Sequence, residues 1–378
     1  MKTHIKQGLK QLGAILVYIV VLGGVGFIGY RIGMESTPLT DEGNLDVGRL
    51  LIRIGIVMVI AGGLVYGHVI IHELGHLLAG KLSGYTFMLF RIGRFGLIKE
   101  DGQFKTISFT MSGTMGQCLM HPPENNDRRP YRLYLLGGVL ANGITALIAG
   151  AFYLIYPSEY IMIFIVIGVM SATMNGIPLS FNDGKILRKL GRSSVAQDQF
   201  FQQLKWNGEF VRHNKTYSEV AEDQMTFNPN EPVTEQFNVY NKLIEINASL
   251  EQKNFKRAES NLSDLYDQRS EIIPPYRIEI LREYVYCLLI EDSGTPELIE
   301  RILSDKLLKS HLKMKQADVC RVNCVIAYFV DNDRTKAKRW YDLAREHLDK
   351  LPTYADKRVN TNLLDHIETV MAFGTHNN

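Results

Sequence analysis

Four long hydrophobic runs constrain this chain more than any other feature of its sequence. They cover residues 11–30, 54–71, 133–156 and 160–180, and none of them contains Asp, Glu, Lys or Arg. A helix needs about 20 mostly apolar residues to cross the hydrocarbon core of a bilayer. We therefore predict a mainly α-helical, polytopic membrane protein with about four transmembrane helices.

Charge separates this hydrophobic half from the rest of the chain. Residues 1–180 contain 24 Asp, Glu, Lys and Arg side chains, whereas the other 198 residues contain 58, which is typical of a soluble domain. The formal net charge is only +2, which excludes a strongly basic nucleic-acid-binding protein by charge. We predict a membrane domain, with the lipid bilayer as its partner, followed by an all-α soluble domain.

The charges between the runs predict the orientation. The N-terminus, the segment between the second and third runs and the segment after the fourth run are basic, whereas the segment after the first run is mainly acidic. Basic loops stay in the cytoplasm, so both termini should be cytoplasmic in a multi-pass protein, most naturally of a bacterial cell membrane. The first run is predicted to be a retained anchor, and a cleaved signal peptide is the alternative.

The segment at about 85–111 is not helical in pattern. It is rich in aromatic and β-branched residues, and Asp101-Gly102 is a typical hairpin turn. We predict a β-hairpin that either dips into the membrane face or caps the helix bundle from the cytoplasm. Its edge is also a candidate to add an extended substrate strand by backbone pairing.

The second run leads into the strongest motif of the chain, His72-Glu73-Leu74-Gly75-His76. Side chains four residues apart share one helix face, so both imidazoles can reach one ion, and zinc is the expected cofactor. Glu73 then lies where a metal-bound water would sit. The alternative is a metal-free polar cluster, but two histidines and a glutamate inside a hydrophobic helix are unstable without partners.

Other polar residues in the hydrophobic runs have less certain roles. His68 is one turn before His72, but three ligands from one straight helix give poor tetrahedral geometry, so a bonded or second-layer histidine is the preferred interpretation. Asp183 is the carboxylate near the same membrane side as His76, either a third ligand or part of a simple helix cap and exit turn. Asn142 follows two glycines in the third run and bonds either to a neighbouring helix or to the site.

These three clusters together resemble the site-2 protease family of intramembrane zinc metalloproteases. The resemblance covers about residues 50–190 and consists of the His72-Glu73-x-x-His76 helix, the small-residue motif ending in Asn142, and the segment from Asn175-x-x-Pro178 to Asp183-Gly184. Val139 stands where the family usually has proline, and Phe181 and Asn182 replace a second proline and a leucine. The region has no segment suited to the PDZ domain of some relatives.

The resemblance implies a function as well as a fold. His72, His76 and Asp183 would bind Zn²⁺, Glu73 would act as general base, and Asn175 would lie near the substrate backbone as a second catalytic residue. The implied activity is regulated intramembrane proteolysis of a single-span membrane protein or a precursor peptide. The rival hypothesis is a membrane scaffold or receptor, in which the metal site is structural or vestigial and the C-terminal tail binds a partner.

The boundaries follow from these features. Residues 1–48 should form the anchor and an extracytoplasmic loop, 49–192 the metalloprotease core with its hairpin, and 193–378 a cytoplasmic helical domain. Helix-period segments recur in pairs in the tail, 234–252 with 254–267 and 317–330 with 334–348. They resemble a degenerate tetratricopeptide-like array, which would offer a concave surface to a protein partner, and a plain helical bundle is the alternative.

Overall fold

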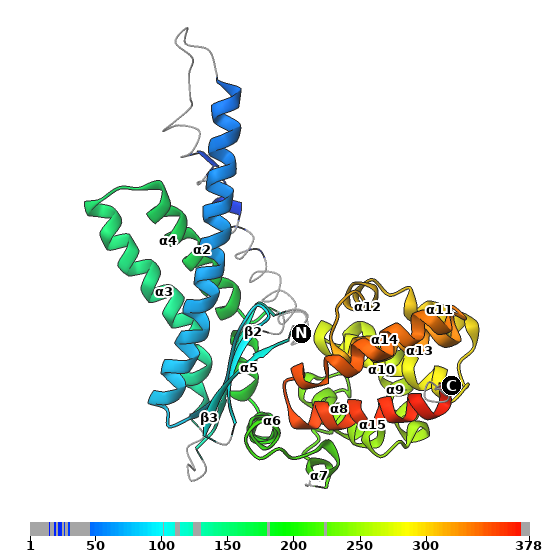
Figure 1. The fold of residues 1–378 in the computed structure, drawn as a ribbon. Coiled ribbons are helices and arrows are strands. Elements are labelled where there is room, and N and C mark those ends of the chain that lie inside the picture. The colour runs from blue at the N-terminus through cyan, green and yellow to red at the C-terminus, as the bar shows by residue number, and fades with distance from the viewer. Residues whose placement is uncertain are drawn as a thin grey trace, which may run out of the picture. The chain divides into compact units, whose positions relative to one another are not determined.

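A computed structural model describes most of the chain (Figure 1). The described residues are 46–371 except 101, 110–113, 124–129, 180–181 and 223–224, together with a few single positions between 15 and 30. The first hydrophobic run lies mostly outside them, so the fourth crossing stays a prediction. The chain divides into two compact units, Met1–Phe87 with Pro123–Ser193 and Met88–Pro122 with Ser194–Asn378. The sheet residues thus group with the C-terminal helices, whereas the sequence placed them with the membrane core.

The first unit is built on three helices that are long and apolar enough to cross a membrane, which confirms this property for three of the four predicted runs. They are α2 (Val47–Leu82), α3 (Tyr131–Ile155) and α4 (Glu159–Gly176), and the short α5 (Asp183–Leu190) follows. With 36 residues, α2 is about 54 Å long and exceeds the roughly 30 Å hydrocarbon core. Pro178 stands just beyond α4, where proline prevents the helix from continuing.

Glycines bring α2 and α3 into backbone contact. A Cβ atom added at Gly75 would lie 2.3 Å from the carbonyl oxygen of Gly137, and one added at Gly137 would lie 2.4 Å from that of Gly75. Small residues allow such close approach between helices in a membrane, where dispersion contacts replace the hydrophobic effect as the driving force. Near the other end of α2, Arg53 Nη2 pairs with Glu159 Oε2 at 2.7 Å and ties α2 to α4.

The predicted hairpin is part of a four-stranded antiparallel sheet. Its strands are β1 (Thr86–Ile92), β2 (Phe95–Glu100), β3 (Gln103–Ser108) and β4 (Gly116–His121), in the order β3-β2-β1-β4. Glu100 pairs with Gln103, so the turn between β2 and β3 is at the predicted position. The single-hairpin prediction missed the turn at Gly93, whose φ is +59°, and the fourth strand, whose Gly, Gln and His residues have little strand preference.

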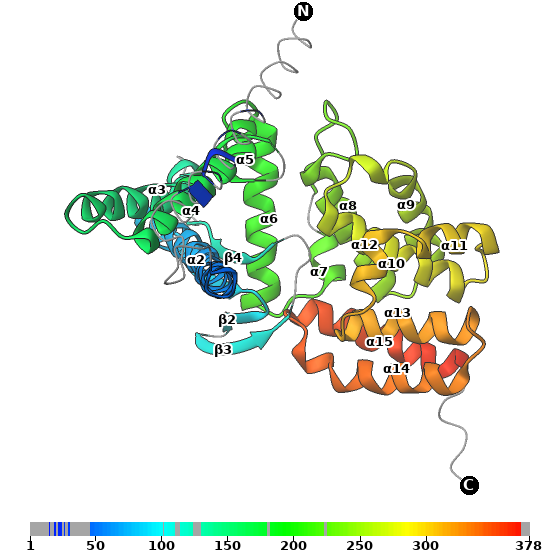
Figure 2. The ribbon, with the colours of Figure 1, turned by 90° about the horizontal axis from the view of Figure 1, so that it is seen from above.

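Helices make up the rest of the second unit (Figure 2). The two predicted helical pairs correspond to α8 with α9 and α13 with α14, and each pair is joined by a short polar turn. Asn254 and Asp333 cap the second helix of each pair by accepting from backbone N–H groups. The full order is α6 (Ser194–Arg212), α7 (Tyr217–Ala221), α8 (Gln236–Glu251), α9 (Phe255–Asp267), η1 (Arg269–Glu271), α10 (Pro274–Ile290), α11 (Pro296–Leu303), α12 (Lys306–His311), α13 (Ala317–Phe329), α14 (Arg334–Glu346), η2 (Leu348–Lys350) and α15 (Tyr354–Met371).

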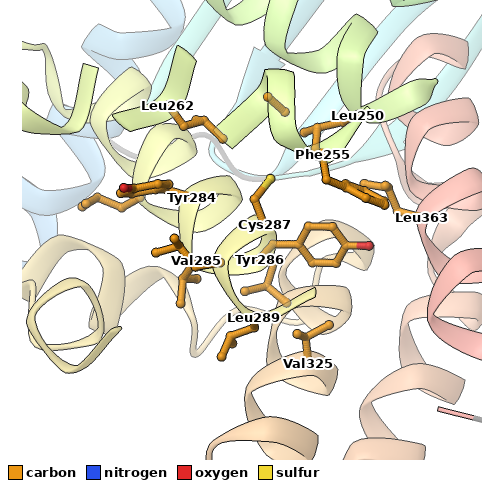
Figure 3. Close-up of a cluster of buried hydrophobic side chains, with 14 of the residues drawn as sticks. Leu250, Phe255, Leu262, Tyr284, Val285, Tyr286, Cys287, Leu289, Val325 and Leu363 are labelled. Atoms are coloured by element: carbon orange, nitrogen blue, oxygen red, sulfur yellow. The ribbon is translucent and has the colours of Figure 1, made fainter. Parts of the chain in front are cut away.

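One apolar core runs through these helices (Figure 3). Helix α10 lies at its centre, because Val285, Tyr286 and Cys287 are all fully buried on successive positions. They belong to one cluster of buried apolar side chains that also includes residues of α8, α9, α13 and α15, among them Leu250 and Leu363. A helix that is buried on nearly all sides is expected only in the middle of a multi-helix layer.

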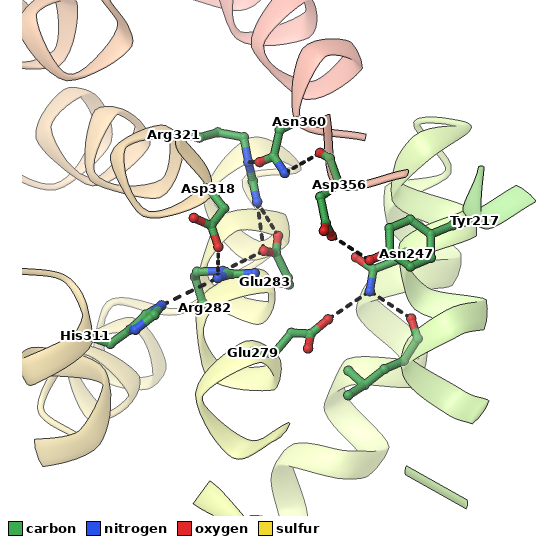
Figure 4. A network of polar contacts seen from close by, with 11 residues as sticks. Tyr217, Asn247, Glu279, Arg282, Glu283, His311, Asp318, Arg321, Asp356 and Asn360 are labelled. Atoms are coloured by element: carbon green, nitrogen blue, oxygen red, sulfur yellow. Dashed lines mark hydrogen bonds and ion pairs between the residues drawn. The ribbon is translucent and has the colours of Figure 1, made fainter. Parts of the chain in front are cut away.

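A polar network crosses the same core (Figure 4). Arg321 donates from Nη2 to both carboxylate oxygens of Glu283, at 2.8 and 2.7 Å, and from Nε to Asn360 Oδ1 at 2.8 Å. Arg282 also pairs with Glu283 and with Asp318. Glu283 and Arg321 are 2% and 1% exposed, so this pair connects α10 and α13 without access to water.

Replacing Glu283 by Ala should destabilise the second unit by about 3–5 kcal/mol, because the substitution leaves the buried Arg321 charge uncompensated. Trp206 and Trp340, the two tryptophans of the chain, both belong to this unit. Their fluorescence during urea unfolding of the detergent-solubilised full chain measures the effect. Asp349→Ala, which removes the exposed partner of Lys357, is the control and should change the stability by less than about 1 kcal/mol. Equal losses in the two variants would contradict the prediction.

The stability of this unit should also depend on Glu279. Burial raises the pKa of its carboxyl from 4.5 to about 7, although Asn247 Nδ2 donates to it at 2.8 Å. Since the folded chain holds this proton more tightly than the unfolded chain, folding should become less favourable as the pH rises from about 4.5 through 7. Comparing wild type with Glu279→Gln in the same unfolding assay at pH 5 and pH 8 isolates this group. The variant should lack the loss, and parallel pH profiles would refute the assignment.

Candidate metal centre

His72 and His76 lie one turn apart on α2 and point to the same side of the helix. Both are buried, with exposed fractions of 8% and 5%, and their rings meet edge to face with centroids 4.7 Å apart. Gly138 of α3 makes room for His72, because a Cβ atom at Gly138 would lie 2.5–2.6 Å from three atoms of the imidazole ring. The close contact of α2 and α3 therefore places the first ring directly against the α3 backbone.

The structure brings Asp183 to these two histidines. Its Oδ2 atom lies 3.1 Å from His72 Nε2 and 3.3 Å from His76 Nε2, and the two Nε2 atoms are 3.1 Å apart. A tetrahedral zinc ion with bonds of about 2.0–2.2 Å needs ligand atoms about 3.3–3.5 Å apart. In the part of the chain that the structure describes, no other group of three or more His, Cys, Asp or Glu residues has such an arrangement.

The proton positions favour a cation among these three atoms. His76 Nδ1 lies 2.8 Å from the carbonyl oxygen of Tyr134, which can only accept, so Nδ1 carries a proton. In a neutral His76 the Nε2 atom is then a bare lone pair, and it faces a carboxylate oxygen that is also an acceptor. Two acceptors 3.3 Å apart repel each other unless a proton or a metal ion lies between them. A backbone carbonyl behind a histidine is also the usual support of a metal-binding imidazole.

Asp183 is held by the residue before it. Asn182 caps α5 by accepting from the Lys185 N–H at 3.0 Å, and its Nδ2 donates to the carbonyl oxygens of Met174 and Ile177 at the end of α4. The cap that the sequence allowed at Asp183 is thus made by Asn182, which leaves the Asp183 carboxylate for the histidines. Burial raises the pKa of Asp183, but the imidazoles of His72 and His76 lower it by more, so the net pKa is below its ordinary value.

The start of α5, which carries Asp183, lies in close backbone contact with the end of α4. A Cβ atom at Gly184 would lie 2.1 Å from the Gly176 carbonyl oxygen, so only glycine allows α5 to begin against the end of α4. Asn175 belongs to the same end of α4, and its Nδ2 donates to the Ser171 carbonyl oxygen at 3.0 Å within its own helix. Its expected position near a substrate backbone stays a prediction. Glu73 is 8% exposed and close enough to His76 to interact with it electrostatically.

Asn142 links the candidate metal centre to His68. It is fully buried on α3, where its Oδ1 lies 3.1 Å from His68 Nδ1, and its Nδ2 lies 3.4 Å from His72 Nδ1 and donates to Ser171 Oγ of α4 at 2.8 Å. His68 is not among the three converging atoms. Its Nε2 atom faces the Phe164 carbonyl oxygen at 3.0 Å instead. The sequence left two interpretations open for Asn142, a bond to a neighbouring helix and a bond to the site. Asn142 makes both kinds of contact, because it bonds to Ser171 of α4 and also lies next to the His72 ring.

Several residues that shape the centre were not singled out in the sequence. The Tyr134 carbonyl, Ser171 and Asn182 are ordinary in type, and only their positions one or two turns from the motif residues could have suggested them. Comparisons of the chain with family models, with curated proteins and with solved structures found no match. The similarity to site-2 proteases therefore rests on the motifs.

Substituting Gly138 by Ala should displace the His72 ring, because the added methyl group would overlap with it. We expect Zn²⁺ binding to weaken about 10–100-fold, the effect that is usual when a group that orients a metal-binding histidine is lost. Gly143→Ala on the same helix is the matched control, since a Cβ atom there meets nothing within 4 Å. Competition with a chromogenic chelator on the purified, detergent-solubilised chain measures both affinities. Equal affinities for the two variants would show that the contact with Gly138 does not position His72.

Proposed function

We propose that this chain is an intramembrane zinc metalloprotease similar to the site-2 proteases. The observation that supports it is the meeting of His72 Nε2, His76 Nε2 and Asp183 Oδ2 within 3.3 Å of one another, with Glu73 next to the first histidine. Two nitrogen donors and one carboxylate are the ligand set of many catalytic zinc sites, which keep a fourth position for water or substrate. A structural zinc site would more often have four protein ligands, commonly with cysteine.

Each residue of the site would have a separate role in peptide hydrolysis. A Zn²⁺ ion held by the three ligands would polarise the scissile carbonyl and make a water molecule acidic near neutral pH. Glu73 takes the proton of the attacking water and returns it to the leaving amine, as a general base and then a general acid. Asn175 is the candidate donor to the substrate backbone. Because the site lies on apolar helices, it excludes bulk water, which strengthens each of these electrostatic interactions.

The substrate we propose is a transmembrane segment of a single-span protein or a precursor peptide. Such a segment must unwind locally before hydrolysis, because every backbone group of a membrane helix is otherwise bonded internally. Strand β3 is one of the two outer strands of the sheet and is largely exposed, so its backbone is suited to pair with an extended peptide. The helical pairs of residues 194–371 would recruit the soluble part of the substrate in the cytoplasm, as a tetratricopeptide-like array does.

The deciding experiment is Glu73→Gln in the full chain. The variant should bind Zn²⁺ like the wild type but lose about 10²–10⁴-fold in cleavage of a co-expressed membrane substrate. Glu297→Gln, at an exposed position of α11, controls for the amide substitution and should cleave normally. Mass spectrometry of membrane peptides that accumulate only in the Glu73→Gln strain would identify the substrate.

The third ligand needs its own variant. Asp183→Ala should lose both bound zinc and cleavage, which separates a ligand from a base. If Glu73→Gln left cleavage and the cellular role of the chain unchanged, the enzyme hypothesis would fail and a membrane scaffold would take its place. Undiminished zinc in Asp183→Ala would exclude this carboxylate as a ligand.

A further inference from the structure

His68 occupies a prepared position among three membrane helices although it is not a ligand. Only 1% of it is exposed, and its ring packs on Phe164 with centroids 4.3 Å apart. A Cβ atom at Gly168 would lie 2.7 Å from His68 Cε1, so the glycine leaves space for the ring. An imidazole at membrane depth is costly and marks a function by default. Both of its nitrogens have partners, and those partners determine where its proton lies.

The Phe164 carbonyl decides the tautomer of His68. A carbonyl oxygen only accepts, so the nitrogen facing it, Nε2 at 3.0 Å, must carry a proton. In neutral His68 the other nitrogen, Nδ1, is then bare and needs a donor. The atom opposite it in the structure is Asn142 Oδ1, at 3.1 Å, while Nδ2 of the same amide faces Ser171 Oγ and His72 Nδ1. Asn142 Oδ1 cannot donate, whereas the NH₂ group can, so neutral His68 is satisfied when the NH₂ group faces it.

This requirement determines the direction of the whole Asn142 amide. The amide oxygen and nitrogen exchange places by a 180° turn about the last side-chain bond. If the amide is turned so that NH₂ faces His68, Oδ1 takes the place of Nδ2 toward Ser171 Oγ and His72 Nδ1, two atoms that can both donate to it. His72 then carries its proton on Nδ1 and presents a bare Nε2 atom to Asp183. His76 reaches the same tautomer through the Tyr134 carbonyl.

The opposite direction of the amide gives the opposite result. In the direction that the structure has, Oδ1 faces His68 and the NH₂ group lies 3.4 Å from His72 Nδ1, where it can donate, so a neutral His72 carries its proton on Nε2. That proton points at Asp183 Oδ2, 3.1 Å away, and forms an ordinary hydrogen bond where a metal ion would bind. The two directions of one amide therefore correspond to a metal-ready and a metal-free form of His72.

We propose that His68 is a positioning residue, which acts through Asn142 to hold His72 in the tautomer that binds the metal. The series of hydrogen bonds begins at the Phe164 carbonyl of α4 and continues through His68 and Asn142 to His72. Each bond determines which nitrogen of the next imidazole, or which end of the amide, can donate. The inference rests on the metal site of the proposed function but not on proteolysis. It explains why a third histidine stands on α2 without contributing a ligand.

The test compares two substitutions of His68 in the detergent-solubilised full chain. His68→Phe keeps the volume and the packing on Phe164 but removes both nitrogens, so it should weaken Zn²⁺ binding about 10–100-fold. His68→Gln can donate to the Phe164 carbonyl and accept from Asn142, so it should restore most of the affinity. Thr173→Ala, which removes a hydrogen bond within α4 to the Val169 carbonyl, is the control and should bind normally.

Two readouts distinguish positioning from mere packing. Chelator competition gives the Zn²⁺ affinity, and the visible absorption of the Co²⁺-loaded chain reports whether the metal remains tetrahedral. A packing role predicts that Phe is tolerated better than Gln and that the affinity of the folded protein does not change. Zn²⁺ affinity of His68→Phe within threefold of wild type, or failure of Gln to restore it, would overturn the proposal.

Variants of Asn142 test the same series of hydrogen bonds if His68→Phe does not fold. Asn142→Asp presents oxygen in both directions, so it accepts from His72 Nδ1 and should keep Zn²⁺ affinity, whereas Asn142→Leu should lose it. Equal affinity in these two variants also rejects the proposal. Failure of the proposed function is distinguishable: wild type without stoichiometric zinc refutes the site itself, whereas normal zinc with cleavage in Glu73→Gln refutes only the protease.

Discussion

The cost of an unpaired polar group inside an apolar environment governs the first unit of this protein, which contains the three helices long and apolar enough to cross a membrane. Water is not available there to complete a hydrogen bond, so each buried nitrogen or oxygen needs a partner from a neighbouring helix. The Tyr134 and Phe164 carbonyls and the Asn142 amide provide these partners for the histidines of α2. Glycines on the facing helices leave the necessary space. Packing and proton positions are therefore two results of one constraint.

The sequence was sufficient for the parts of the fold that depend on local pattern. Apolar runs predicted α2, α3 and α4, the Asp101-Gly102 turn was expected at its observed position, and helical periodicity found two pairs in the C-terminal part. Strand β4 was missed because its partner is β1, about 25 residues earlier, and its own residues do not favour a strand. Pairing between distant segments depends on tertiary contacts, which local pattern does not contain.

The candidate site was predictable to a similar degree. The spacing of His72 and His76 follows from helix geometry, and Asp183 entered as a possible ligand because it is the carboxylate near the same membrane side as His76; the motif shared with site-2 proteases then implied the same role. Nothing in the sequence distinguished a ligand from a cap at Asp183, since Asn and Asp are common at both. In the structure Asn182 makes the cap, and the Asp183 carboxylate lies next to the two histidines. Hydrogen bonds to backbone carbonyls, such as that of Tyr134, cannot be predicted from residue types at all.

Helix geometry also explains why the third atom comes from another element. His68 and His76 are eight residues apart, so they are separated by about 12 Å along the α2 axis, far beyond the span of ligands about 2 Å from one ion. A single helix can provide only two ligands at i and i+4, and a third must come from a second segment. Helix α5 provides it because Gly184 allows its first turn to lie against the last turn of α4. His68, the third histidine of α2, is therefore not a ligand and can act on the site only through the Asn142 amide, which contacts both His68 and His72.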